Sequence, residues 1–386
     1  MKVAQGADGT PTRVTLTDLL RYFAWLGTYG FGGPIATVGY MQRDLVEQRR
    51  WVKERDFLDG IALGQTMPGP LAAQVVMWVG FLHGRMVGAL LAAVAFVLPS
   101  FVVVLSFAII YVHYEGLAWL QALFYGIAPA MITIMALAAL KLARLTNQGN
   151  LRLWGIGFTV MAVTAVREAE LAALVIAAGL LMVFWDAPPR LFRRGVGAFL
   201  VGGWGQGVLL GAATLGTNVA MFLFFLKAGA FIFGSGLAIV PFLRAGVVEQ
   251  HQWLTESQFL DAVAMGLITP GPVVISATFI GYLVGGLLGA AVATVAIFIP
   301  IYLGVVIPGP WFVRHRDNPQ IKAFVKGATA AAAGAIAGAT VVLSRDAIVD
   351  VQTVAIALIA LVLLVQFKLK EPFIVLLGAA VGLALA

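Results

Sequence analysis

The sequence predicts an all-α polytopic membrane protein with about 12–13 transmembrane segments arranged in two homologous halves. The first observation is composition: 61% of the 386 residues are hydrophobic, 11% are charged, and the mean hydropathy is +0.96. A soluble protein of this length needs more charge to cover its surface. The second observation is that apolar stretches of about 20 residues, each long enough to cross a bilayer, recur along the chain. The third is an internal repeat.

The polar residues 1–18 predict an N-terminal cytoplasmic tail. The apolar stretches that follow predict membrane segments at 19–41, 57–83, 86–112, 117–142, 151–166, 170–186, 197–215, 219–243, 259–284, 286–310, 322–344, 347–367 and 372–386. The stretch 197–215 gives the weakest signal, because it is rich in glycine and contains Gln206. A linker rich in proline and arginine at 187–196 separates a first half, 19–186, from a second half, 197–386.

The repeat is visible when the chain is compared with itself at an offset of 202 residues. Between residues 31 and 70, 17 of 40 positions are identical to residues 233–272. After a slip of one residue, Pro99 corresponds to Pro300. Biased composition does not produce such an ordered run, so the sequence indicates a duplication, which is common in secondary transporters.

Loop charges favour halves of opposite orientation, that is, inverted repeats. Residues 42–56 contain five Lys or Arg residues, whereas their counterparts at 244–257 contain one. Conversely, residues 311–326 contain four and the matching stretch 113–125 contains none. Because cytoplasmic loops collect Lys and Arg, both trends fit inversion if one intervening segment is re-entrant.

Each half contains a Pro-Gly-Pro motif inside an apolar segment, and proline interrupts a helix there. The motifs are Pro68, Gly69 and Pro70 in the first half and Pro270, Gly271 and Pro272 in the second. A helix that restarts after the motif exposes backbone N–H groups, predicted at residues 71–73 and 273–275. These groups suit an anion, and the alternative is a packing kink satisfied by water or side chains.

Polar side chains and glycines near these motifs are further candidates for binding an anion. The side chains are Gln65, Thr66 and Gln74 in the first half and Thr269 and Ser276 in the second. Two additional breaks are predicted at Gly32 and Gly33 and at Gly234 and Ser235, where the backbone can approach a ligand closely. Helix packing is the alternative explanation for all of these residues.

Lys227 lies within the otherwise uncharged run 217–241. A lysine at the centre of a membrane helix costs about 2.5–3.5 kcal/mol, which an anionic substrate would offset. The alternative is a side chain that extends to the membrane interface. The equivalent residues Asp59 and Asp261 lie near the starts of the segments that carry Pro-Gly-Pro. Helix capping is expected for them, and proton coupling is the alternative.

Several kinds of function are disfavoured. The net charge of +7 comes from short loops rather than a basic stripe, so no nucleic acid is expected as a partner. The absence of cysteine excludes disulfides and thiolate metal sites. The four histidines show no metal-ligand spacing, and no cofactor motif or catalytic pair is found. We therefore expect neither metal nor cofactor and no enzymatic activity, with a membrane-embedded enzyme as a remote alternative.

Together, several motifs resemble those of the chromate ion transporter family. The first half contains FGGPIATVGYMQRDLVEQRRW, QTMPGPLAAQ and FVLPSF, and the second contains FLKAGAFIFGSGLAIVP, GLITPGPVV and AIFIP. The likeness extends from Tyr22 to Arg345. The family's Phe-Gly-Gly, Gln-x-x-Pro-Gly-Pro and Lys-x-Gly patterns correspond to residues 31–33, 65–70 and 227–229. Leu267 and Ser235 depart from the polar and glycine residues of some relatives.

The resemblance implies a secondary transporter in the bacterial inner membrane that exports chromate from the cytoplasm and confers chromate resistance. It also implies halves of opposite orientation and use of the proton-motive force. Sulfate or another tetrahedral oxyanion is the alternative substrate, because sulfate and chromate match in charge and shape. A passive channel is a further alternative.

Overall fold

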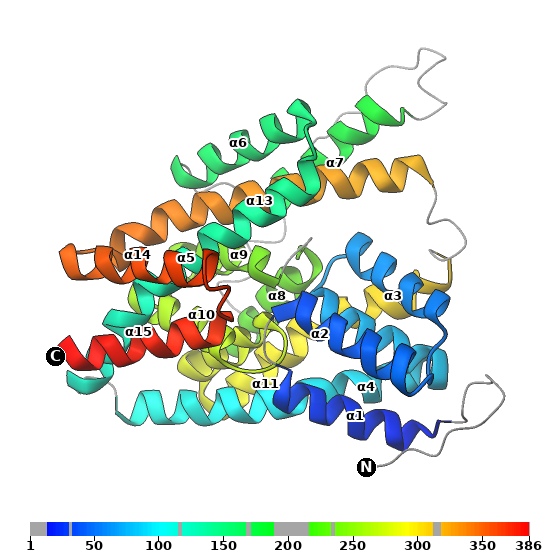
Figure 1. Ribbon diagram of the computed structural model, residues 1–386, viewed down its shortest axis with the longest axis horizontal. Helices are drawn as coiled ribbons and strands as arrows, with labels where there is room; N and C mark the ends of the chain where they lie inside the picture. Colours follow the sequence, from blue (N-terminus) through cyan, green and yellow to red (C-terminus); the bar gives the residue numbers. More distant parts are fainter. Residues whose placement is uncertain are drawn as a thin grey trace.

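The computed structural model describes residues 14–30, 33–114, 118–166, 171–188, 216–232, 236–311 and 318–385 (Figure 1). These residues form helices joined by short turns, with no strand among them, so the predicted all-α class is confirmed. The predicted segment 197–215, residues 189–196 of the predicted linker and residues 1–13 of the predicted tail lie outside the described residues.

The helices of the first half are α1 (Leu16–Tyr29), α2 (Gly33–Met41), the π-helical η1 (Gln42–Gln48), α3 (Glu54–Thr66), α4 (Leu71–His113), α5 (Ala118–Asn147), α6 (Leu151–Val166) and α7 (Leu171–Asp186). The helices α5, α6 and α7 follow the predicted segments 117–142, 151–166 and 170–186 closely, whereas the predicted segments 19–41 and 57–83 are each divided. The predicted break between residues 19 and 41 is present, because α1 ends at Tyr29 and a separate helix begins at Gly33.

The second half repeats this order of helices. It contains α8 (Thr217–Ala230), η4 (Gly236–Ala238), α9 (Ile239–Arg244), the π-helical η5 (Ala245–Gln250), α10 (Glu256–Ile268), η6 (Val273–Ile275), α11 (Ser276–Val306), α13 (Pro319–Ala347), α14 (Val351–Val365) and α15 (Glu371–Leu385). The helices α6 and α14 start 200 residues apart, as do α7 and α15. The duplication therefore extends beyond the stretch in which identical residues reveal it.

The helix α4 reverses direction at a two-residue turn. Its backbone leaves helical geometry at Gly84 (φ −145°, ψ 21°) and Arg85 (φ 50°, ψ −140°). Beyond this turn the carbonyl of Gly88 lies against Gly80, although residues eight apart in a continuous helix are separated by about 12 Å. The turn falls between the predicted segments 57–83 and 86–112.

We call residues 71–83 the short arm of α4 and residues 86–113 its long arm. The short arm packs antiparallel to α3, because Trp78 Nε1 donates a hydrogen bond of 2.9 Å to the carbonyl of Asp56. Each of these two helices has 13 residues and is about 20 Å long, too short to cross a core of roughly 30 Å. The segment predicted at 57–83 is thus a re-entrant hairpin with Pro-Gly-Pro at its tip.

A second hairpin is formed by α1, α2 and η1. Tyr22 Oη in α1 donates a hydrogen bond of 3.2 Å to Asp44 Oδ2 in η1, so the chain returns to the side from which α1 started. In the second half, α8 folds back on α9, and Phe224 stacks on Phe242 with 5.9 Å between ring centroids. Both halves therefore carry re-entrant hairpins in which helix breaks form the tips.

The two halves have opposite orientations. The helix α11 turns at residues 285–286, as α4 does at Gly84, and its long arm runs beside the long arm of α4. Tyr302 Oη, late in the α11 arm, donates 3.0 Å to the carbonyl of Met86 at the start of the α4 arm. At the other end of the α4 arm, Tyr111 packs on Phe279, near the α11 turn. These equivalent arms run antiparallel, so the predicted inversion is confirmed.

The re-entrant hairpin makes the distribution of Lys and Arg among the loops consistent with halves of opposite orientation. With α3 and the short arm of α4 on one side, only the long arm of α4 crosses between residues 42–56 and residues 113–125. Inversion then places the described residues 42–56 and 318–326, with five and two basic residues, on one side. The described residues 118–125 and 244–257, with none and one, lie on the other side, as a single cytoplasmic face requires.

The peripheral helices are exchanged between the halves. The helix α5 of the first half packs on α15 of the second, where Gly126 lies against Gly378. Reciprocally, α13 of the second half packs on α6 of the first, where Gly334 lies against the carbonyl of Gly157. Figure 1 shows α13 running beside α6 and α7. Small residues at these contacts let the helix backbones approach closely, as membrane helices do.

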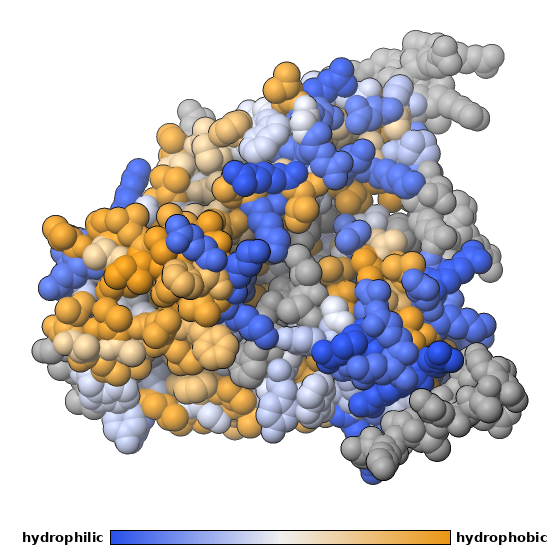
Figure 2. Space-filling model, in the orientation of Figure 1, coloured by the Kyte–Doolittle hydropathy of each residue, from blue (hydrophilic) through white to orange (hydrophobic). Residues whose placement is uncertain are grey.

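The outer surface is suited to lipid. Four helical stretches among the described residues are long and apolar enough to cross a membrane: Leu71–His113, Ala122–Asn147, Val273–Trp311 and Pro319–Ala347. Shorter apolar helices such as α14 and α15 surround them, and large apolar side chains on their outer faces are exposed. Figure 2 shows apolar residues gathered over α14 and α15 and hydrophilic residues gathered near α1–α3. The chain is thus a multi-pass membrane protein.

Candidate functional site

The first break separates α3 from α4. The helix α3 ends at Thr66, and α4 begins at Leu71 after Pro70, which provides no side-chain cap. Gly69 adopts φ 142°, a conformation that side-chain-bearing residues rarely adopt. The first bond into α4 runs from the Gln74 N–H to the Pro70 carbonyl (3.1 Å). The N–H groups of residues 71–73 therefore have no acceptor within their own helix.

The second break differs in one respect from the prediction. Gly271 adopts φ 103°, and the chain then enters the 3₁₀ turn η6 instead of starting an α-helix at once. The tighter turn lets Ile275 N–H donate to the carbonyl of Pro272 (2.9 Å). The predicted free N–H of Ile275 is thus occupied, and the first-turn N–H groups of Val273 and Val274 remain without an acceptor in their own helix.

The breaks of the two halves meet. The N–H of Gly69 donates a hydrogen bond of 2.6 Å to the carbonyl of Ile232, two residues past the end of α8. A methyl group at Gly69 would also lie 3.0 Å from Ile301 Cγ2 in α11. Reciprocally, Gly271 lies against Ser100 Oγ in α4, and Ser100 is the repeat counterpart of Ile301. Each Pro-Gly-Pro tip therefore docks on the long arm of the opposite half.

The side chain of Gln74 stabilises the backbone at the first break. Its side chain is fully buried, and Nε2 donates to the carbonyls of Pro68 (2.9 Å) and Met67 (3.2 Å). These carbonyls have lost their helical partners at the break, so the amide replaces them. Its Oε1 atom has no hydrogen-bond partner among the described residues. The amide N–H₂ group of Gln74 thus holds the tip in place, in addition to any role toward a ligand.

The predicted hydroxyl donors occupy different environments. Thr66 and Thr269 donate back to carbonyls of their own helices, at 2.7 Å each, and Thr269 is buried. Ser276 is buried at the start of α11, close to Gly266. Gln65 is exposed in the last turn of α3. Thr66 and Thr269 retain oxygen lone pairs only, since their protons are used within the helix.

Lys227 lies in the last turn of α8, three residues before the helix ends at Ala230. The run 217–241 is therefore not one helix, and a cation at this end is favourable for the helix dipole. Its side chain is exposed on the protein surface. Two residues later, Gly229 packs on Ile297 of α11, which brings the end of α8 to the tip contact at Ile232.

The glycine motifs of the two other breaks are described only in part. Gly33 begins α2. Gly32, Gly234 and Ser235 lie outside the described residues.

Asp59 and Asp261 do not cap helices, so the interpretation as capping residues is wrong. The N-cap of α3 is Lys53, and the N-cap of α10 is Thr255, which forms a capping box with Gln258. Both carboxylates lie one turn further in, with only 4% and 6% of their surfaces exposed. Tyr111 Oη of the first half donates to Asp261 Oδ2 at 2.8 Å. Sequence reasoning did not find Tyr111, which lies in an apolar run without a distinguishing pattern.

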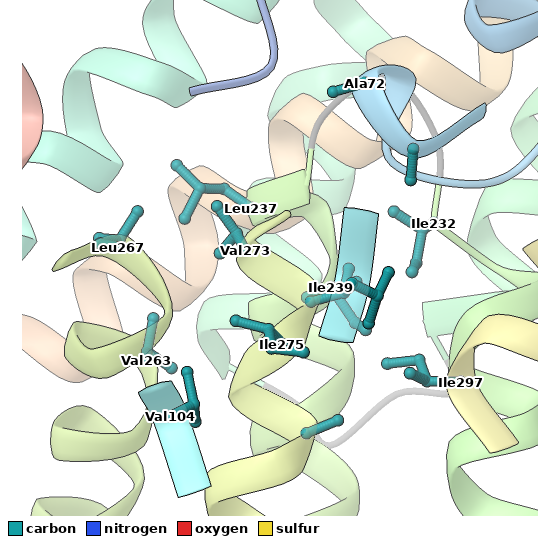
Figure 3. Packing of buried hydrophobic residues seen from close by; sticks show 14 of the residues in the cluster. Ala72, Val104, Ile232, Leu237, Ile239, Val263, Leu267, Val273, Ile275 and Ile297 are labelled. Carbon is teal, nitrogen blue, oxygen red and sulfur yellow. The ribbon is translucent and has the colours of Figure 1, made fainter. Parts of the chain in front are cut away.

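Apolar side chains surround the meeting point of the breaks. Figure 3 shows Leu237 and Val273 side by side, with Ile239 and Ile275 next to them. Ile232 lies in the same cluster and is buried like the others. Water is scarce among such residues, so a backbone N–H that faces them gains from an anionic or carbonyl partner.

Comparison with known proteins identifies close relatives. A family described as chromate transporter matches residues 17–200 and 219–383. A chromate transport protein of Cupriavidus metallidurans is 50% identical over 98% of this chain and 96% of its own. A probable chromate transport protein of Synechococcus elongatus is 48% identical over 95% of both chains. A chromate transport protein of Pseudomonas aeruginosa is 28% identical over 88% of this chain and 83% of its own. No solved structure matches.

Proposed function

The chain belongs to the chromate transporter family, and on this premise we propose that it is a secondary active transporter exporting chromate from the cytoplasm across the bacterial inner membrane. Its activity would confer chromate resistance. The observation that carries the proposal is the contact between breaks of inverted halves, the Gly69–Ile232 hydrogen bond. A binding site at the junction of inverted repeats can open to either side when one half rocks against the other.

The chemistry of the breaks favours an anion. The N–H groups of residues 71–73 and of residues 273–274 carry the partial positive charge of helix N-termini. Lys227, at the end of α8, adds a full positive charge near the same junction. The substrate-binding residues that we propose are Gly32, Gly33, Gln65, Thr66, Pro68, Gly69, Pro70, Gln74, Lys227, Gly234, Ser235, Thr269, Pro270, Gly271, Pro272 and Ser276. Thr66 and Thr269 would donate to the anion after their hydroxyl protons rotate away from the carbonyls of their own helices.

The Gly69–Ile232 bond indicates how binding and motion are linked. In this arrangement the Gly69 N–H is used by the opposite half, and the Gln74 amide is used by the tip itself. A dianion that approaches the tip competes with the Ile232 carbonyl for the same donor. Binding would thus loosen the contact between the halves at the point about which they must move.

Sulfate is the second candidate substrate. Backbone N–H groups and a lysine recognise charge and shape, which sulfate and chromate share, and they leave no side-chain pattern that rejects either ion. The same reasoning applies to other tetrahedral oxyanions.

Everted membrane vesicles test the proposal, because export from the cytoplasm becomes uptake into the vesicle. We expect energised vesicles with the protein to accumulate radiolabelled chromate, and an uncoupler to abolish accumulation. Uptake that survives the uncoupler would indicate a passive channel, and chromium recovered in a reduced state would indicate an enzyme. Unlabelled sulfate that suppresses uptake at concentrations equal to chromate would identify a general oxyanion carrier.

A further inference from the structure

A buried tyrosine–carboxyl pair joins the two halves away from the Pro-Gly-Pro tips. Tyr111, near the end of the long arm of α4, donates 2.8 Å to Asp261 in the second turn of α10. Both side chains are 6% exposed. The Tyr111 ring is held edge-on between Phe124 and Phe279, with centroids 5.5 and 5.2 Å away. The hydroxyl is therefore fixed in position beside the carboxyl group.

We propose that Asp261, positioned by Tyr111, is the residue that binds the coupling proton on the extracytoplasmic side of the membrane. This inference rests on the proposed function and deepens it, because it assigns a site to the coupling proton. A carboxyl group inside a membrane protein is costly and is typical of proton pathways. The step is a simple protonation: the Asp261 carboxylate takes a proton from the extracytoplasmic water and later releases it toward the cytoplasm.

A tyrosine hydroxyl suits this step. It donates a hydrogen bond to the carboxylate when Asp261 is charged, and by rotation it accepts one from the carboxylic acid. The buried group is thus satisfied in both states, whereas an arginine would hold it permanently charged. A site that must load and unload a proton in each cycle needs this property.

The repeat makes the site asymmetric. Asp59 is the counterpart of Asp261 and is buried at the same depth of α3, on the opposite side of the protein. The residue at the position of Tyr111 in the second half is Phe312, at an offset of 201, and it has no hydroxyl. The tyrosine hydroxyl that faces Asp261 is thus not repeated in the sequence of the second half.

Other charged groups occur on the elements around α10. Arg244 forms ion pairs with Glu249 and Glu256, and Lys141 acts electrostatically on Glu371. The remaining titratable residues on these elements are exposed or half-buried: His83, Arg85, His113, Tyr125, Arg144, Tyr282, Tyr302, Lys322, Lys326, Arg345 and Asp346.

Proteoliposomes separate proton coupling from anion binding. Chromate accumulation driven by a pH gradient requires both, whereas exchange of internal for external chromate without a gradient requires binding and movement alone. We expect Asp261→Asn to lose gradient-driven accumulation at least tenfold and to retain exchange. Tyr111→Phe should retain accumulation but shift the midpoint of its pH profile upward by roughly one unit, because a hydrogen bond that stabilises the carboxylate is removed.

Tyr302→Phe is the matched control, since it deletes another hydroxyl that joins the halves but contacts the Met86 carbonyl. Its pH profile should equal that of the wild type. Loss of exchange in Asp261→Asn, with normal protein levels, would assign the residue to structure and overturn the proposal. The proposal would also be overturned if Asp261→Asn accumulated chromate as the wild type does, or if Tyr111→Phe and Tyr302→Phe had the same pH profile. Failure of exchange in the wild type would instead contradict the proposed transport function.

Discussion

At the scale of residues, the two glycines of the Pro-Gly-Pro motifs connect the halves. Gly69 and Gly271 both have positive φ, and both lie against the long arm of the opposite half. Position 69 requires glycine for two separate reasons. Its backbone has a positive φ, and a side chain would collide with Gln74 and Ile301. These reasons can be separated by experiment.

We expect Gly69→Ala to reduce chromate transport by roughly tenfold or more, because the added methyl lies 2.8 Å from Gln74 Nε2 and displaces the tip. Gly149→Ala is the control: Gly149 has φ 84° but nothing within 4 Å of an added methyl. Backbone strain of about 1–3 kcal/mol is common to both variants, so the control should transport normally. Initial rates in everted vesicles, normalised to protein amount, make the comparison. Equal rates would remove the tip contact from the mechanism.

Sequence patterns predicted which residues form the breaks but not what those residues contact. Proline and glycine determine the local backbone, so the positions of the breaks follow from residue type. The partner of the Gly69 N–H is 163 residues away, at Ile232, and no local pattern specifies it. The same applies to Tyr111 and Asp261, which are 150 residues apart. The burial of Asp59 one turn inside α3 shows that distance from an apparent helix start is a poor guide to capping.

At the scale of elements, the re-entrant hairpins are the main difference between the structure and a set of helices that each cross the membrane once. Hydrophobic length predicted a segment at 57–83, and the structure divides it into two antiparallel helices of 13 residues. Length and hydropathy do not specify whether a broken segment continues across the membrane or turns back. The loop charges contained that information, because they required one re-entrant segment for consistency.

Single-cysteine labelling tests the hairpins, and the natural chain contains no cysteine. A membrane-impermeant thiol reagent should reach Arg50→Cys and Arg85→Cys from the same side, because the hairpin between them does not cross. Gln252→Cys, at the position equivalent to Arg50, and Leu287→Cys, next to the counterpart of Arg85 at Gly286, should be reached from the opposite side. Labelling of Arg50→Cys and Arg85→Cys from different sides would mean that the segment spans the membrane.

At the scale of the whole molecule, inversion and exchange of helices create a single unit from two halves. The antiparallel long arms of α4 and α11 form its centre, and each half places its peripheral helix against the other half. The repeat and its inversion were predictable from identities and loop charges. The exchange of α5 and α13 was not, because both helices consist largely of small and apolar residues, which fit several partners.

We propose that this molecule moves chromate out of the cytoplasm through the junction near Lys227. The most direct measurement is the chromate retained by cells loaded with it, comparing the wild-type protein, Lys227→Ala and an empty vector, with Lys227→Arg as a charge-preserving control. We predict low retention with the wild type and retention equal to the empty vector with Lys227→Ala, at matched expression. Equal retention in all strains would contradict chromate export, and normal clearance by Lys227→Ala would remove Lys227 from the site.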